Sequence, residues 1–127
     1  MSADADLAVV DPGAAAAGGA DRWERICPTS GLVVDRGAAA MVDGAQVAIF
    51  LLANGDLHAI DDRDPFSGAA VLSRGLVGDV AGEPTVASPV YKQRFALRTG
   101  RCLDDDSVSL RTWAARVRDG FIEVAVP

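Results

Sequence analysis

From Trp23 onward, short apolar runs are separated by turn residues, and no apolar pattern repeats every 3.6 residues over the length of a helix. Such runs predict β-strands. In the last run, Ile122 and Val124 alternate with Phe121 and Glu123, so we expect a strand buried on one face. The predicted strands are Trp23–Cys27, Ala38–Val42, Gln46–Leu52, Leu57–Asp61, Thr85–Ser88, Arg94–Leu97, Ser109–Arg118 and Phe121–Val126.

Three dipeptides predict where these strands turn back on themselves. Asp43-Gly44, Asn54-Gly55 and Asp119-Gly120 each lie between two apolar runs. Glycine and a preceding Asn or Asp tolerate the positive φ that tight hairpin turns require. The fold class predicted is therefore all-β, with small antiparallel sheets.

Residues 62–84 interrupt this pattern, because they are rich in Gly, Pro, Ser and Asp and poor in strand-forming runs. We expect a long connection with one short helical turn near Ala69–Leu72. Long loops of this kind in compact domains are usually functional or poorly ordered.

Residues 1–21 differ from the rest, since they are mostly Ala, Gly and Asp and contain no basic residue. They offer too little apolar surface to offset chain entropy, so we expect a disordered tail at 1–21 and one domain at 22–127. The chain has a formal net charge of −6, and several of its acidic residues lie in the tail. A basic stripe typical of nucleic-acid binding is missing from the domain.

Neither a secretory signal nor a membrane-spanning run is present in the sequence, so we expect a cytoplasmic protein with no membrane partner. The two cysteines, Cys27 and Cys102, are too few for a disulfide framework and are predicted to be buried thiols. His58 lies inside a predicted strand, where we expect it to be packed. The glycines follow no phosphate-binding pattern, and we expect no catalytic, cofactor-binding or metal-binding residue on this chain.

Two loops carry short motifs that occur in a recognisable order along the chain. Asp64-Pro65-Phe66 and Ser88-Pro89-Val90-Tyr91 precede Phe95-Ala96-Leu97-Arg98-Thr99-Gly100, and they follow the runs Gly44–Phe50 and Asn54–Asp61. In this order, the segments from Trp23 to Val126 resemble a Rieske-like domain. More narrowly, they resemble the small subunit of assimilatory NAD(P)H-dependent nitrite reductase.

Cluster-binding relatives carry Cys-Pro-His and Cys-Pro-x-His in these loops, so the resemblance makes Asp64, Phe66, Ser88 and Tyr91 former ligand positions. A Rieske [2Fe–2S] cluster needs two thiolates and two imidazoles. The sequence contains two cysteines and one histidine in all. We therefore expect a Rieske-like fold with two apical loops and no cluster.

The resemblance also implies a function. It predicts a non-catalytic small subunit that supports or docks to a large subunit carrying FAD, a [4Fe–4S] cluster and sirohaem. That complex would reduce nitrite to ammonium in nitrate assimilation. Two alternatives stay open: a Rieske-type ferredoxin component of an oxygenase, and a free-standing Rieske-like adaptor domain.

Phe66 and Tyr91 suggest what replaces the metal, because aromatic side chains bury large apolar areas. In one hypothesis both aromatics pack to hold the loops together. In the other they are exposed anchors for a partner.

Charge adds a second hint about a partner. Residues 84–103 contain no acidic residue, so their four basic side chains form either a solvated face or a docking surface for an acidic patch. The acidic groups Asp61-Asp62-Arg63-Asp64 and Asp104-Asp105-Asp106 are interpreted as solvated turns rather than cation sites. The docking candidates are Phe66, Tyr91, Lys92, Arg94, Arg98 and Arg101.

Overall fold

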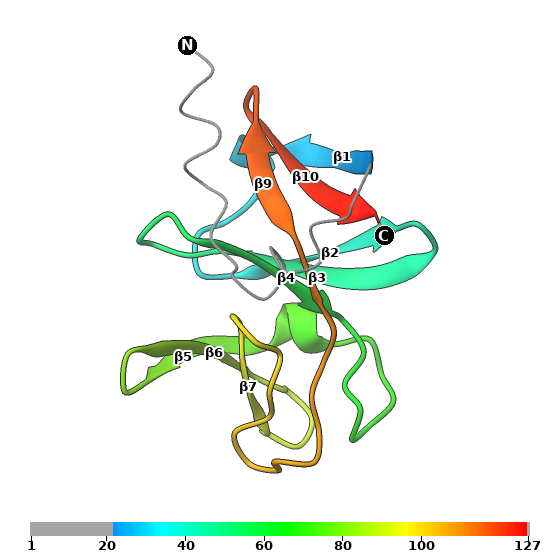
Figure 1. Ribbon diagram of the computed structural model, residues 1–127. Helices are drawn as coiled ribbons and strands as arrows, with labels where there is room; N and C mark the ends of the chain where they lie inside the picture. The colour runs from blue at the N-terminus through cyan, green and yellow to red at the C-terminus, as the bar shows by residue number, and fades with distance from the viewer. Residues whose placement is uncertain (1–21, 127) are drawn as a thin grey trace.

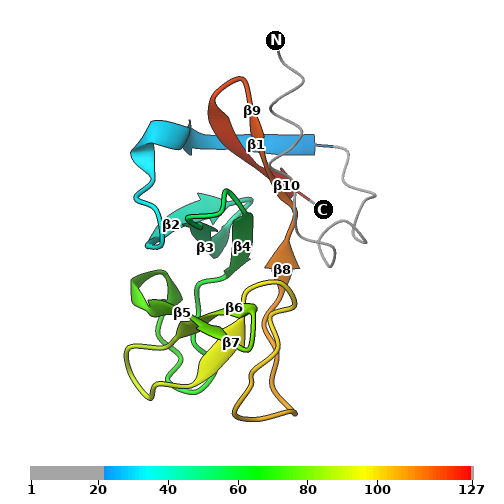
Figure 2. The same ribbon diagram turned by 90° about the vertical axis from the view of Figure 1, so that its left-hand side faces the viewer.

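The computed structural model describes residues 22–126, so the tail predicted at 1–21 lies outside the described residues. Three small antiparallel sheets are stacked along the long direction of the molecule (Figures 1 and 2). The all-β prediction is confirmed. The upper sheet contains β1 (Arg22–Pro28), β10 (Phe121–Val126) and β9 (Ala115–Arg118), in that order.

The middle sheet has the order β2 (Gly37–Val42), β3 (Ala45–Leu51), β4 (Leu57–Asp61) and β8 (Thr112–Trp113). The lower sheet has the order β5 (Leu76–Val80), β6 (Glu83–Ala87) and β7 (Arg94–Ala96). Two short 3₁₀ helices, η2 (Thr29–Gly31) and η3 (Leu72–Arg74), complete the elements of residues 22–126. No helix among these residues is long and apolar enough to cross a bilayer.

The middle sheet is buried on both faces, and β3 shows why. Successive side chains of a strand point to opposite faces. Val47 and Ile49 pack into an upper core shared with Ile122 of the upper sheet. Ala48 and Phe50 pack into a lower core with residues of the lower sheet. The continuous apolar run in β3 is thus explained by two cores on either side of one strand.

The three predicted hairpins are confirmed by the antiparallel pairs β2–β3, β3–β4 and β9–β10. Asp43 and Gly44 have φ values of 50° and 81°, so both central residues of that turn are left-handed. A fourth hairpin joins β5 to β6 through Ala81 and Gly82, with φ values of 53° and 88°. Ala-Gly is not a typical pair for such a turn, so the pattern did not indicate it.

The connection at 62–84 is more regular than expected. Its second half forms η3 and the edge strand β5, so the prediction of no strand there is wrong. The helical turn lies at Leu72–Arg74, slightly after its predicted position. Gly78 and Asp79 give β5 little strand propensity, and pairing with β6 along its whole length supplies the stabilisation instead.

The single strand predicted at Ser109–Arg118 is also wrong. The chain forms β8, crosses at Ala114, and then forms β9 in a different sheet. The sequence shows no sign of this change of sheet, because residues 109–118 contain no glycine or proline to mark a break.

Strand β10 departs from its predicted half-burial. It is the central strand of the upper sheet, and Ile122 to Val126 are all buried. Its outer face carries Glu123, whose Oε1 accepts a hydrogen bond from Arg116 Nε at 2.8 Å. The Arg116 guanidinium lies 3.9 Å from the centre of the Trp23 ring. On the other side, Arg25 lies 3.6 Å from Glu123 and 4.3 Å from the centre of the Phe121 ring. These charged and aromatic side chains cover the face that was expected to meet solvent.

Candidate functional site

The loops that begin at Asp64 and Ser88 lie at the lower end of the molecule, and a direct hydrogen bond joins them. Asp64 and Ser88 are both 0% exposed. The Ser88 hydroxyl donates to Asp64 Oδ2 at 2.5 Å. Asp64 Oδ1 accepts the backbone N–H of Phe66 at 2.9 Å, and Ser88 Oγ accepts that of Val90 at 3.2 Å. Asp64 and Ser88 thus form a buried polar link, which we call the Asp64–Ser88 link.

The two aromatics have different roles. Phe66 is partly buried against the lower core, with its ring centre 6.2 Å from that of Phe95. Tyr91 is 60% exposed. The hypothesis that both aromatics pack is therefore correct for Phe66 and wrong for Tyr91, because the short hairpin between Ser88 and Gln93 turns Tyr91 outward.

We expect the two aromatics to differ in their effect on stability. Phe66→Ala should lower the free energy of unfolding by about 2 kcal/mol, because a half-buried ring loses its contact with the lower core. Tyr91→Ala should change it by less than about 0.5 kcal/mol, as expected for an exposed side chain. Urea denaturation of both variants measures the difference, and equal effects would contradict the placement of these rings.

The acidic turn of the first loop is not solvated as predicted. Asp62 is 2% exposed, and its Oδ1 accepts the backbone N–H of Ser73 at 2.7 Å. Asp64 is the buried member of the Asp64–Ser88 link. Asp61 Oδ1 accepts a hydrogen bond from Trp113 Nε1 at 2.9 Å. These carboxylates hold loop backbone and side chains in place, which the sequence pattern did not indicate.

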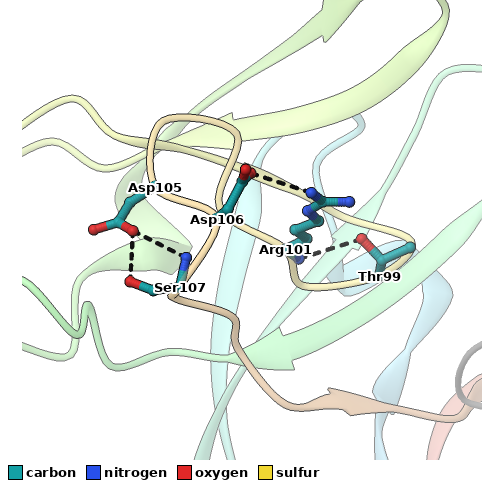
Figure 3. A network of polar contacts seen from close by, with 5 residues as sticks. All are labelled: Thr99, Arg101, Asp105, Asp106 and Ser107. Atoms are coloured by element: carbon teal, nitrogen blue, oxygen red, sulfur yellow. Dashed lines mark hydrogen bonds and ion pairs between the residues drawn. The ribbon is translucent and has the colours of Figure 1, made fainter.

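The basic segment is close in space to acidic residues from outside it. Arg94 pairs with Asp104 at 2.9 Å, Arg101 with Asp106 at 3.1 Å (Figure 3), and Arg98 with Glu83 at 3.9 Å. Lys92 lies in a loop with a φ of 68° rather than in a strand, so it does not share a strand face with Arg94. The three arginines are therefore largely neutralised within this chain. The predicted solvation is confirmed for Asp104 and Asp106, which are exposed, whereas Asp105 is partly buried.

Arg94 should control the titration of Asp104. Hydrogen bonds from the Arg94 side chain and backbone hold the pKa of Asp104 below its ordinary value. The ionised Asp104 carboxylate therefore stabilises the folded state at pH values above the pKa that Asp104 has in the unfolded chain. This stabilisation is lost as the pH falls through the lower pKa of Asp104 in the folded state. Arg94→Gln should raise the Asp104 pKa in a carboxyl NMR titration, whereas Lys92→Gln should leave it unchanged. An unshifted Asp104 in Arg94→Gln would contradict this assignment.

Comparison with known proteins identifies the family. The family described as "Rieske-like [2Fe-2S] domain" matches residues 22–125. The nitrite reductase (NADH) small subunit of Salmonella typhimurium is 42% identical over 104 residues, which are 81% of this chain and 96% of that protein. This chain belongs to the family of NAD(P)H nitrite reductase small subunits.

Two further relatives extend the comparison. The crystal structure of an NADH-dependent nitrite reductase small subunit from Mycobacterium tuberculosis has a sequence 48% identical to this chain. The TM-score is 0.81, and the match covers 84% of this chain and 96% of that one. A nitrite reductase [NAD(P)H] large subunit from Klebsiella oxytoca is 40% identical over 102 residues, which are 80% of this chain but 11% of that protein. The Rieske-like fold is thus established, and the same domain occurs within a much longer polypeptide.

The residues of the two loops do not fit the [2Fe–2S] cluster that the family description implies. The loops present Asp64, Phe66, Ser88 and Tyr91, none of which is a thiolate or imidazole donor. Asp64 and Ser88 use their polar atoms to bond each other. The donors that the sequence does contain lie elsewhere: Cys27 packs against the upper core, Cys102 lies in the lower core, and His58 is buried in β4.

The two cysteines lie in apolar surroundings. Burial raises the pKa of the Cys27 thiol, which disfavours its thiolate. Cys102 is 0% exposed, whereas Cys27 is only partly buried, so the prediction of two buried thiols is correct in full for Cys102 alone. Sequence reasoning singled out two loops that the structure brings together, but it missed the Asp64–Ser88 link. The signal available was that both residues at the former cysteine positions are polar and able to bond each other.

Proposed function

We propose that this chain is the non-catalytic small subunit of a cytoplasmic NAD(P)H nitrite reductase and that it acts by binding the large subunit. In this proposal the reduction of nitrite to ammonium takes place on FAD, a [4Fe–4S] cluster and sirohaem held by the large subunit. This assignment follows the rule that cofactors carry the difficult redox steps. The chain itself contributes a rigid surface.

The observation that carries the proposal is the relative from Klebsiella oxytoca. A segment similar to most of this chain forms part of a polypeptide named as the large subunit. A domain joined covalently to an enzyme in one organism commonly binds the same enzyme when it is a separate chain. The expected partner is therefore the large subunit.

A role as an electron-carrying ferredoxin of an oxygenase is not supported, because it requires a cluster. The two loops provide no donor of the kind that a Rieske cluster uses, and their Asp64–Ser88 link holds them without metal. A free-standing adaptor would keep the same fold but would bind no nitrite reductase large subunit.

The lower end of the molecule is a candidate docking surface. Val90 is 43% exposed and Tyr91 60% exposed at the tip of the second loop. Lys92 adjoins them and forms no ion pair with residues 22–126. Tyrosine is enriched in interface cores. Arg94 follows this loop at the start of β7, whereas Arg98 pairs with Glu83 at the other end of the β6–β7 hairpin. Arg94, Arg98 and Arg101 are all partners of acidic residues, so they supply little free charge.

The test is co-expression of the chain with the large subunit from the same source. We expect a stable complex on size-exclusion chromatography, and NADH-dependent nitrite reduction that falls when the chain is omitted. Tyr91→Ala should weaken the complex, while Val33→Ala, an exposed valine before β2, serves as the matched control. A large subunit that neither binds this chain nor responds to it would overturn the proposal and favour the adaptor.

A further inference from the structure

A surface hollow of about 510 Å³ lies at the end of the middle sheet, beside the start of the first loop, since Arg63 directly precedes Asp64. It is bounded by the β2–β3 turn and by side chains from the ends of β3 and β4 and the segment before β8. Backbone hydrogen bonds tie this region together, from Asp62 N–H to the Gln46 carbonyl and from Asp61 N–H to the Arg111 carbonyl. The polar residues that line the hollow are Gln46, Asp61, Arg63 and Arg111.

Arg63 and Arg111 stand out because both line one hollow, whereas six other arginines of residues 22–126 are paired with carboxylates. Within residues 22–126, neither of them forms an ion pair. This is unexpected in a chain of net charge −6. The paired arginines are Arg22, Arg25, Arg94, Arg98, Arg101 and Arg116.

Both guanidinium groups are held in place without using a carboxylate. Arg63 donates a hydrogen bond to the carbonyl of Gly68. The Arg111 guanidinium lies 3.8 Å from the centre of the Trp113 ring, and Trp113 Nε1 is fixed by Asp61 Oδ1 at 2.9 Å. The Asp61 carboxylate also lines the hollow, but one of its oxygens is engaged with the indole, and two guanidinium groups outnumber it. Stacking on an aromatic ring orients an arginine while leaving its N–H donors free.

We propose that this arginine hollow, formed by Arg63 and Arg111, binds an acidic side chain of the nitrite reductase large subunit. The inference rests on the proposed function, since it names one contact of that complex. A planar guanidinium matches a carboxylate in shape and charge, and the charge-assisted hydrogen bonds formed are among the stronger kinds. The partner is taken to be the large subunit because a domain like this one is fused to it in Klebsiella oxytoca.

The experiment measures the affinity of the purified chain for the purified large subunit by calorimetry at several salt concentrations. Arg63→Gln combined with Arg111→Gln should weaken binding about 10- to 100-fold and flatten its salt dependence. Arg74→Gln removes an exposed arginine on η3 that does not line the hollow, and it should bind within about twofold of the unmodified chain.

A second variant separates the effect of positive charge from that of the planar guanidinium shape. Arg111→Lys keeps the positive charge but loses the planar fork, so it should bind more weakly than the unmodified chain and more tightly than Arg111→Gln. Urea midpoints of all variants identify any that are unfolded.

Each other outcome overturns one specific statement. If the complex forms and the double variant binds as tightly as Arg74→Gln, the arginine hollow is not a contact and the proposed function stands. If the unmodified chain binds no large subunit, the proposed function fails and takes this contact with it. If the unmodified chain self-associates in light scattering and the double variant does not, the acidic occupant belongs to a second copy and the assignment to the large subunit is wrong.

Discussion

Asp64→Ala should lower the free energy of unfolding by about 3 kcal/mol. The substitution leaves the Ser88 hydroxyl and the Phe66 N–H without their acceptor in a region where Asp64 and Ser88 are 0% exposed. A buried donor that loses its acceptor incurs a full desolvation penalty, and the bonds lost here are made to a carboxyl group. The loop that begins at Asp64 should also become mobile, since the two loops present no thiolate or imidazole donor that could hold it through a Rieske cluster.

Asp105 provides a matched control for this prediction, because it makes the same kinds of bonds at a partly exposed position. Its Oδ1 accepts the backbone N–H of Ser107 at 3.0 Å and the Ser107 hydroxyl at 2.6 Å (Figure 3). Water can replace these bonds, so Asp105→Ala should have little effect on urea denaturation. Equal losses in Asp64→Ala and Asp105→Ala would contradict the role assigned to burial.

A double-mutant cycle isolates the Asp64–Ser88 link itself. Ser88→Ala alone should cost about 1 to 2 kcal/mol, and the two substitutions together should cost less than their sum. Additive losses would show that the two loops are held by something other than this hydrogen bond.

Glu123→Ala should lower the free energy of unfolding by about 3 to 5 kcal/mol. The Glu123 side chain is 9% exposed and lies between the guanidinium groups of Arg116 and Arg25. Its removal leaves the Arg116 charge, whose side chain is only 18% exposed, without a counter-ion. It also disturbs the stacking of Arg116 on Trp23, so the outer face of the upper sheet loses its cover.

The Arg101–Asp106 pair is the control for Glu123, since both of its side chains are well exposed, at 61% and 83%. Asp106→Ala should change stability by less than about 1 kcal/mol, as is typical of surface ion pairs. Thermal and urea unfolding of the two variants give the comparison. If Glu123→Ala lowers the free energy of unfolding no more than Asp106→Ala does, then Glu123 and its stacked arginines do not stabilise the upper sheet.

The sequence indicated the fold where local chemistry and global packing agree. Asp43-Gly44 and Asp119-Gly120 lie at hairpin turns because both positions need positive φ. The run in β3 was a strand because its apolar side chains serve two cores at once. In contrast, β5 is stabilised by its neighbour β6, and the change of sheet at Ala114 is decided by tertiary packing. Neither leaves a local signal.

The candidate site was predicted in position but not in chemistry. The loop motifs placed Asp64, Phe66, Ser88 and Tyr91 together, and the structure brings Asp64 and Ser88 into contact. The aromatics drew attention because they carry the larger apolar area, yet a hydrogen bond between two small polar residues joins the loops. The basic segment looked free of acid along the chain, but Asp104, Asp106 and Glu83 reach it in space.

The central claim is that this chain works by contact with the large subunit and has no cluster of its own. Measuring the iron content of the chain together with its effect on nitrite reduction tests this claim most directly. The chain would be purified without exposure to oxygen, assayed for iron and inorganic sulfide, and added to the large subunit in the NADH-dependent nitrite reduction assay. We predict full stimulation by a chain whose iron and sulfide are far below stoichiometric. Stoichiometric iron and sulfide in the active chain, with stimulation lost when they are removed, would contradict the account.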